Sequence, residues 1–378
     1  MHYHHIVIGA GSMGMAAGYQ LAKGGGKTLL LDSFSPPHDN GSHHGETRLI
    51  RYAYGEGLEY VPFALRAGTL WHELQEATDK KIFHQTGVLN AGAKETPFIQ
   101  NVMACAKKFN LPLEVFSSAE VKDKWPGIQL PEHYLGCFEP TAGVLQAENC
   151  IAAYKESALK EGAEIRSNSR VVTIDVQLDK ITVKTLDGAA FTADSIVLSV
   201  GAWAGDLLKQ LNLNLPLNPV RKTFAWYEAE EELYNENNLP GFAIQAEEAF
   251  YYGFPSINSA GLKVGRHDGG IPINPNEERM AFGNLPEDTG DLHNFIYTYM
   301  PSAGQLKYGK TCMYTMTPDE DFIIDLHPTH KNIAIAAGFS GHGFKFASAV
   351  GEALSQLIIY GSAELDLTPF AINRFINK

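Results

Sequence analysis

The N-terminal stretch, residues 1–32, contains the pattern that most constrains how this chain can fold. Ile6-Val7-Ile8 and Leu29-Leu30-Leu31 are short apolar runs typical of buried parallel strands, and residues 12–23 between them have helical spacing. The turn after the first run reads Gly9-Ala10-Gly11-Ser12-Met13-Gly14. Strand, glycine-rich turn, helix and strand in this order predict a βαβ unit of a nucleotide-binding fold.

The three glycines of this turn have separate physical roles. Gly9 allows the tight turn, Gly11 lets a pyrophosphate approach the backbone at the positive end of the helix, and Gly14 lets helix and strand pack closely. Asp32 follows the second strand, where its carboxylate can accept the hydroxyls of an adenosine ribose. The pattern predicts a dinucleotide site and leaves NAD and FAD both open. The alternative is a turn that only packs a helix, with Asp32 solvated.

Charge and composition narrow the class of protein. The formal net charge of −13 argues against nucleic acid or an anionic membrane as a partner. No stretch approaches the ~18 uninterrupted apolar residues of a membrane span, and no basic and apolar leader precedes the first strand, so we expect a cytoplasmic protein. The length of 378 residues predicts about two domains.

Neither a metal site nor a disulfide framework is expected. The four cysteines are dispersed along the chain, without Cys-x-x-Cys spacing. His43 and His44 are adjacent, so their side chains point apart, and no acidic or sulfur ligand accompanies them at useful spacing.

Residues 33–52 are too rich in Pro, Gly, Ser and Asn for a regular element and too long for a simple connection. This segment also contains Arg48 and Arg51, whose guanidinium groups are suited to binding anions. We interpret it as a segment that passes the cofactor and presents both arginines to anions. The alternative is a solvated basic loop.

The alternation of strands and helices is interrupted twice by β-rich sequence, and the chain then returns to its first architecture, with a closing helix expected over residues 343–360. A chain that opens and closes in one nucleotide fold is typical of FAD enzymes. We therefore expect an α/β fold with two discontinuous domains. The first is a Rossmann-like FAD-binding domain of the glutathione-reductase type, residues 1–82, 150–217 and 320–378. The second is an α+β catalytic domain with a large mixed β-sheet and helices, residues 83–149 and 218–319.

Five motifs, spread over most of the chain, carry a resemblance to a known family. They are Gly-Ser-His-His-Gly-Glu-Thr-Arg at 41–48, Tyr-Gly-Glu-Gly at 54–57, Tyr-Tyr-Gly-Phe-Pro at 251–255, Lys-Thr-Cys-Met-Tyr-Thr at 310–315 and Gly-Phe-Ser-Gly-His-Gly-Phe-Lys-Phe at 338–346. The chain resembles the monomeric sarcosine oxidase and N-methyltryptophan oxidase family of flavin amine oxidases. The resemblance implies a monomeric enzyme that uses FAD and O2 to demethylate a small N-methyl amino acid, giving formaldehyde and hydrogen peroxide.

The same resemblance implies roles for individual residues. Cys312 is expected to hold the flavin through a thioether, and Arg48 to lie against the flavin. Arg51 and Lys345 are expected to clamp the substrate carboxylate, and Lys263 to activate oxygen. From the residues alone, Cys312 reads as a buried thiol that neighbouring Lys310 could shift toward a thiolate, and Lys345 as a lysine on a helix surface.

Further residues follow from the resemblance. His44, Tyr252, His267 and Tyr314 are expected to line the substrate cavity and to bind or orient the amine. Contacts to the cofactor are implied for Gly9, Gly11, Gly14, Asp32, Ser42, Thr47, Arg48, Val171, Gly341, Gly343 and Lys345.

Three positions depart from the sarcosine oxidase pattern, namely Tyr52, Ala243 and Arg266. They leave substrate size open between sarcosine and N-methyl-L-tryptophan. Two alternatives from other classes also remain: an NAD-dependent dehydrogenase, and a flavin-bearing protein without turnover.

Overall fold

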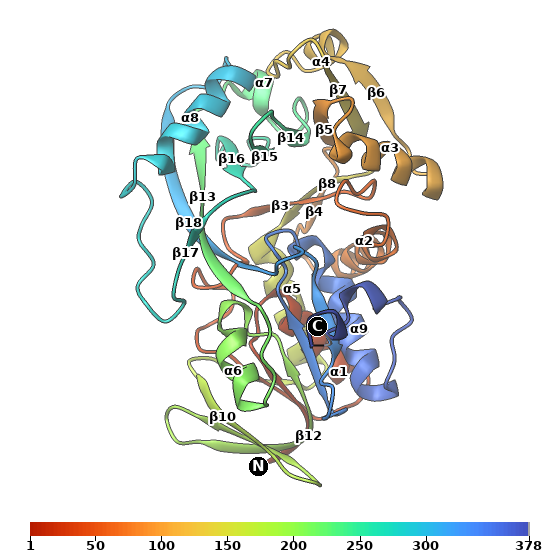
Figure 1. Cartoon of the computed structure of the whole chain (residues 1–378), viewed down its shortest axis with the longest axis vertical. Coiled ribbons are helices and arrows are strands. Elements are labelled where there is room, and N and C mark those ends of the chain that lie inside the picture. The colour runs from red at the N-terminus through yellow and green to blue at the C-terminus, as the bar shows by residue number, and fades with distance from the viewer. Residues whose placement is uncertain (377–378) are drawn as a thin grey trace.

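The computed structural model describes residues 1–376 and contains two large β-sheets, one above the other in the view of Figure 1. Both chain termini belong to the lower part, with the helices α1, α5 and α9. The upper part contains the second sheet and the helices α3, α4, α7 and α8.

The first sheet has eight strands and is built around β1 (His2–Ile8). β2 (Thr28–Leu31) and β12 (Ala190–Leu198) flank β1, and both run parallel to it. With α1 (Ser12–Lys23) between β1 and β2, the predicted βαβ unit is confirmed. The other strands of this sheet are β9 (Glu164–Arg166), β10 (Val171–Val176), β11 (Ile181–Thr185), β19 (Ile323–Leu326) and β20 (Ile333–Ala337).

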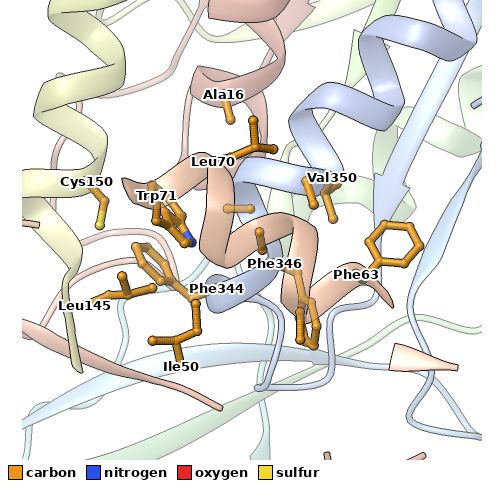
Figure 2. Close-up of a cluster of buried hydrophobic side chains, with 14 of the residues drawn as sticks. Ala16, Ile50, Phe63, Leu70, Trp71, Leu145, Cys150, Phe344, Phe346 and Val350 are labelled. Atoms are coloured by element: carbon orange, nitrogen blue, oxygen red, sulfur yellow. The ribbon is translucent and has the colours of Figure 1, made fainter. Parts of the chain in front are cut away.

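Small residues allow the helices to pack closely against this sheet and against each other. A Cβ on Gly14 of α1 would overlap the carbonyl oxygen of Gly9, and a Cβ on Gly351 of α9 (Ala347–Tyr360) would overlap Ala16 of α1. Figure 2 shows Ala16, Val350 of α9, and Leu70 and Trp71 of α2 (Tyr60–Glu76) in one hydrophobic cluster. This cluster buries one face of the nucleotide-binding layer.

The second sheet has nine strands and is mixed, as predicted. β5 and β14 pair in parallel, and the other pairs are antiparallel. Its strands are β5 (Val88–Ala93), β6 (Glu114–Ser117), β7 (Tyr134–Glu139), β13 (Asn218–Tyr227), β14 (Gly241–Gln245), β15 (Phe250–Phe254), β16 (Leu262–Arg266), β17 (Ile271–Pro272) and β18 (Leu306–Met316).

A small antiparallel sheet lies across the predicted domain boundary. It joins β3 (Thr47–Ile50), from the range predicted for the FAD-binding domain, to β8 (Gly143–Gln146) and β4 (Phe83–His84), from the other range. The strands of the two large sheets fall within the predicted ranges, and the division into domains stays a prediction.

The remaining elements are helices. They are α3 (Pro97–Phe109), α4 (Ser118–Lys124), α5 (Ala147–Lys160), α6 (Ala204–Gln210), α7 (Glu231–Tyr234), α8 (Glu287–Tyr299), α10 (Asn373–Ile376) and the 3-10 turns η1 (Gly201–Trp203), η2 (Phe344–Phe346) and η3 (Thr368–Phe370).

The closing helix differs from its prediction, because α9 begins at Ala347 and not at Gly343. The turn η2 precedes it and contains Lys345. The interpretation of Lys345 as a helix-surface lysine is therefore wrong: its side chain is buried, because the turn directs it into the protein.

Residues 1–376 contain no cluster of three or more His, Cys, Asp or Glu side chains suited to a metal ion. No helix in this range has the length and apolar character needed to cross a membrane.

Candidate active site

A cavity of about 890 Å³ begins at the glycine-rich turn and extends toward the second sheet. Gly9, Gly11 and Asp32 line one end, and Tyr314 and Gly341 line the other. Ser42, Arg48, Val171 and Gly343 also lie on its walls. Most residues expected to contact the cofactor are thus brought to one cavity.

The turn itself is held in a shape that depends on glycine and on Asp32. Gly9 has a φ of +89°, in the left-handed region that favours glycine. The backbone N–H of Ala10 donates to Asp32 Oδ2 at 2.7 Å, and that of Phe34 donates to Asp32 Oδ1 at 2.9 Å. His38 Nε2 also lies 3.3 Å from Oδ1. Oδ2 can still accept one further hydrogen bond, so the carboxylate can bind a ribose hydroxyl.

Sequence reasoning missed another wall of this cavity, in the segment between β17 and α8. Residues 275–279 and Ala281 line it, and Arg279 fixes the segment by donating to Thr311 Oγ1 at 3.0 Å and to the carbonyl of Asp39 at 2.9 Å. A lone arginine in a polar loop gives no signal in the sequence that it lies at the wall of a cavity.

A smaller cavity of about 70 Å³ adjoins the large one. Arg48, Tyr314, Gly341 and Phe344 line both cavities, so the two meet at these side chains. The other walls of the small cavity are Leu49, Arg51, Glu56, Phe224, Ala243, Phe250, Tyr252, Phe254, His267, Cys312, His342 and Lys345.

Arg48 is a fixed cation at the junction of the two cavities. Its guanidinium donates to the carbonyl oxygens of Thr47, Ser42 and His44 at 2.7 to 2.8 Å. It also lies over the ring of Phe344, 5.7 Å from the ring centre. The segment before β3 therefore wraps around this arginine, and the alternative of a solvated basic loop is wrong for Arg48 and Arg51.

Arg51 is buried and forms an ion pair with Glu56 through Nη2 and Oε1. Sequence reasoning missed Glu56, although it lies within the Tyr-Gly-Glu-Gly motif at 54–57. Burial opposes the ionisation of Glu56, but the guanidinium of Arg51 lowers its pKa to about 2. Arg51 Nη1 and Glu56 Oε2 are buried without a hydrogen-bond partner among the described residues.

Lys345 is the second cation of the small cavity wall. Its ammonium group donates to the Tyr54 hydroxyl at 3.0 Å and to the carbonyl of His342 at 2.7 Å. Burial and then the charge of Arg51 lower its pKa to about 7. Trp71 supports the turn, because its Nε1 donates to the Lys345 carbonyl at 2.8 Å and its ring stacks on Phe344 (Figure 2).

Tyr252, Tyr314 and His267 lie on the small cavity wall, as expected. The two tyrosine hydroxyls are 3.4 Å apart. Burial raises the pKa of Tyr252 to about 12 and lowers that of His267 to about 4. At neutral pH these groups are uncharged, so the cations of this wall are its arginines and Lys345.

Lys263 and His44 lie outside the lining of both cavities. Lys263 Nζ donates to the carbonyls of Gly45 and Thr47, and at 3.1 Å to Thr47 Oγ1. Burial, and then the charge of Arg48, lower the pKa of Lys263 well below its ordinary value. The ring nitrogens of His44 are buried and have no hydrogen-bond partner among the described residues. The expected roles of Lys263 and His44 stay predictions.

Cys312 lies on β18 opposite Lys222 of β13, and its side chain lines the small cavity. All four cysteines are free thiols and buried. Burial raises the pKa of the Cys312 thiol, although Arg48, Arg279, Lys222 and Lys263 act in the opposite direction. The interpretation of Cys312 as a buried thiol is therefore confirmed, because loss of solvent outweighs the nearby cations.

The residues of the large cavity fit a flavin dinucleotide. Its one end combines a glycine-rich turn, a helix N-terminus and a carboxylate, the chemistry that binds an adenosine diphosphate. Its other end meets Arg48 and Tyr314, next to the thiol of Cys312. Two residues that the resemblance implies as cofactor contacts do not line this cavity. They are Gly14, which packs against Gly9 of the turn, and Thr47.

Comparisons with known proteins agree with this geometry. The family model described as FAD dependent oxidoreductase matches residues 4–357. A monomeric sarcosine oxidase of Bacillus sp. (strain B-0618) is 52% identical over 376 residues, which are 99% of this chain and 96% of that protein. An N-methyl-L-tryptophan oxidase of Citrobacter koseri is 43% identical over 99% of this chain and 100% of its own length.

Solved structures with low sequence identity share the fold. NikD, an amino acid oxidase essential for nikkomycin biosynthesis, has a TM-score of 0.86 at 21% identity, with 98% of this chain and 97% of that chain covered. Glycine oxidase from Geobacillus kaustophilus has a TM-score of 0.82 at 20% identity, with 99% of each chain covered.

Proposed function

This chain belongs to the FAD-dependent oxidoreductase family, and we propose that it oxidatively demethylates sarcosine and similar secondary N-methyl amino acids. The products are the free amino acid, formaldehyde and hydrogen peroxide. The relatives named monomeric sarcosine oxidase, at 51 to 52% identity over nearly the whole chain, support this substrate class.

One observation carries the proposal: a small cavity with Arg51 and Lys345 on its wall opens beside the far end of the dinucleotide cavity. Two cations converging on one cavity bind a carboxylate, and the protein around them has a net charge of −13. The cavity is small enough to select a small amino acid.

The protein's own residues bind and orient the substrate. Arg51 and Lys345 hold the carboxylate, and the uncharged side chains of Tyr252, Tyr314 and His267 surround the amine and exclude water. FAD held in the large cavity would supply the acceptor for a hydride equivalent from the N-methyl carbon and the donor of electrons to O2. Lys263, held by Thr47 and Gly45, supplies a positive charge toward the negative charge that develops on O2.

We further propose that the flavin is attached covalently through Cys312, which lines the small cavity together with Arg48 and Tyr314, two of the residues that line both cavities. Precipitation with acid tests this attachment. Covalent flavin stays in the protein pellet, and the Cys312→Ser variant should release it into the supernatant. Flavin released from the unmodified protein would contradict the attachment.

The activity is tested by incubating purified protein with sarcosine in air and measuring hydrogen peroxide and formaldehyde. We expect equal amounts of both. NADH-dependent activity without peroxide would favour the dehydrogenase alternative, and a yellow protein inert to both N-methyl amino acids would favour a flavin-binding protein without turnover.

N-Methyl-L-tryptophan is the second candidate substrate, because Ala243 gives the wall of the small cavity a small side chain. A Met at this position fills space that an indole would need. We expect Ala243→Met to lower kcat/KM for N-methyltryptophan relative to sarcosine by about 10-fold or more, since a misfit of a single methylene already costs about 1–3 kcal/mol. An unchanged ratio of the two kcat/KM values would show that Ala243 does not set substrate size.

We also propose that the protein acts as a monomer made of the two discontinuous domains, residues 1–82, 150–217 and 320–378, and residues 83–149 and 218–319. The relatives named as monomeric support the first point. Light scattering of the purified protein tests it, with the mass of a single chain of 41.4 kDa as the expected result.

A further inference from the structure

Glu56 is a carboxylate in a site proposed to bind the carboxylate of an amino acid. Its partner is Arg51, whose guanidinium is proposed to bind that substrate carboxylate. Both side chains line the small cavity. Arg51 Nη1 and Glu56 Oε2 are both buried without a hydrogen-bond partner among the described residues. Leaving such groups without a hydrogen bond is unfavourable. The guanidinium donor and the carboxylate acceptor can therefore both bind a ligand in the small cavity.

An amino acid zwitterion has the complementary groups. Its carboxylate can accept from Arg51, and its ammonium can donate to Glu56, because one carbon separates the two groups. Its oxidation, however, requires an uncharged amine, since the nitrogen lone pair assists the loss of hydride from the N-methyl carbon. An aliphatic ammonium in water keeps its proton up to about pH 10.

We propose that the substrate carboxylate replaces Glu56 on Arg51 and that the displaced Glu56 takes the ammonium proton of the substrate. An N–H bond of the substrate breaks and an O–H bond on Glu56 forms, so the net charge of the cavity does not change. Arg51 keeps one carboxylate partner throughout. After product leaves, Glu56 returns its proton to water and pairs with Arg51 again. This inference rests on the proposed function.

The surroundings of Glu56 explain why displacement makes it a base. Burial disfavours its charged form, and the positive charge of Arg51 is the largest factor that keeps it ionised. Once the substrate carboxylate neutralises Arg51, burial dominates and the proton affinity of Glu56 rises. Glu139 cannot replace Glu56 as the proton acceptor, because its carboxylate already accepts hydrogen bonds from the backbone N–H groups of Tyr52 and Ala53 and from the side chain of Asn90.

The other titratable groups that face Glu56 are weaker candidates for the acceptor of the substrate's ammonium proton. Burial lowers the pKa of His267 to about 4 and that of His342 to about 3, so both hold protons poorly. Tyr54 contributes a hydroxyl whose pKa burial raises well above its ordinary value. Lys345 is the rival acceptor, because its pKa is lowered to about 7.

Proton uptake on binding acetate separates Glu56 from Lys345. Acetate has the carboxylate but no ammonium, and at pH 6 Lys345 is already protonated. With anaerobic holoenzyme in weak buffer containing an indicator dye, we expect uptake of about one proton per site at saturation. Glu56→Gln should bind acetate without uptake, and Glu59→Gln, which changes an exposed carboxylate of the same segment, should behave as the unmodified protein.

Three outcomes of this titration would overturn the proposal. Uptake that persists in Glu56→Gln would assign the proton to another group. Saturation of the unmodified enzyme without uptake would exclude protonation of Glu56. Acetate that neither perturbs the flavin spectrum nor competes with sarcosine would exclude the carboxylate exchange itself.

The pH dependence of flavin reduction gives a second readout. The rate of flavin reduction is measured by anaerobic stopped flow at low sarcosine. At pH 7 we expect this rate to be at least about 10-fold lower in Glu56→Gln than in the unmodified enzyme, and to approach the unmodified rate by pH 10. Glu56→Asp should keep most of the rate at pH 7. Matching profiles for the unmodified enzyme and Glu56→Gln would contradict the proposal. A flavin that sarcosine does not reduce in the unmodified enzyme would instead refute the proposed function, and the acetate titration would still test Glu56.

Discussion

The two ends of the site are built in different ways. At the nucleotide end, one short stretch, residues 1–32, provides the glycine turn and the helix N-terminus through its main chain and the carboxylate of Asp32. At the substrate end, side chains converge from separate segments, including Arg51, Tyr252, His267, Cys312 and Lys345. The first end depends on close backbone approach, and the second depends on buried charge and on tertiary packing.

This difference indicates which substitutions each end tolerates. The nucleotide end should be sensitive to added side-chain volume and to loss of the Asp32 carboxylate, which holds the turn. The substrate end should be sensitive to the loss of single charges, each with its own kinetic signature. The following substitutions test that contrast.

Gly14→Ala should have the largest effect. An added Cβ would overlap the Gly9 carbonyl, so α1 must move away from the turn that receives the dinucleotide. We expect a destabilisation of about 1–3 kcal/mol and loss of most bound flavin, measured by thermal unfolding and by flavin absorbance of the purified protein. Gly205→Ala in α6 is the control, because outside its adjacent residues and its own helix backbone no heavy atom lies within 4 Å of its Cβ position. Equal flavin content in both variants would contradict the role of close packing at Gly14.

Lys263→Met should slow only the oxidative half of the reaction. Removing one preorganised positive charge costs about 2.7–4 kcal/mol, so reoxidation by O2 should slow by about 100- to 1000-fold, while anaerobic reduction by sarcosine stays nearly unchanged. Because burial lowers the pKa of Lys263, the unmodified enzyme should reoxidise faster at low pH and lose rate as pH rises through that pKa. Stopped-flow measurement of both halves, with exposed Lys307→Met as the control, distinguishes this role from general damage. Equal slowing of both halves would exclude it.

Arg51→Ala should raise the sarcosine KM by about 10- to 100-fold, because a hydrogen bond to a charged group contributes about 1.5–3 kcal/mol. The effect on kcat should be smaller, since the lost interaction binds substrate and transition state alike. Steady-state oxygen consumption measures both constants. Arg66→Ala, which removes a surface ion pair with Glu352, should leave KM unchanged. An unchanged KM in Arg51→Ala would remove Arg51 from the carboxylate site.

The smallest expected effect is the pH dependence of carboxylate binding through Lys345. Its pKa is about 7, so the ammonium is charged below pH 7 and loses its charge as pH rises. In Glu56→Gln, which should bind acetate without proton uptake, inhibition by acetate should therefore weaken by up to about 10-fold between pH 6 and pH 8. Adding Lys345→Met to this variant should leave acetate binding weak at both values, and a pH dependence that survives the double substitution would have to come from another group.

The same contrast decides how much could be predicted from the sequence. The βαβ unit and Asp32 were predictable because their signals are local: residue spacing, apolar runs and glycines within one stretch. The presence of a large second sheet followed from its β-rich sequence. The beginning of α9 was misplaced because the 3-10 turn η2 has the same residue types as a first helical turn.

The substrate end could be predicted only through resemblance to a family. Nothing local distinguishes Lys345 from a surface lysine, because its burial depends on Trp71, Tyr54 and His342, which are distant or uninformative in sequence. Glu56 was overlooked for the same reason: its function depends on the pairing with Arg51 in space. Chemistry that arises from tertiary contacts leaves no periodic signal in the chain.

Anaerobic titration of the purified protein with sarcosine tests most directly the claim that the two ends form one site. We expect about one equivalent of sarcosine to bleach the flavin absorbance completely, air to restore it, and NADH to have no effect. A flavin that sarcosine leaves oxidised, or that NADH reduces, would contradict the account.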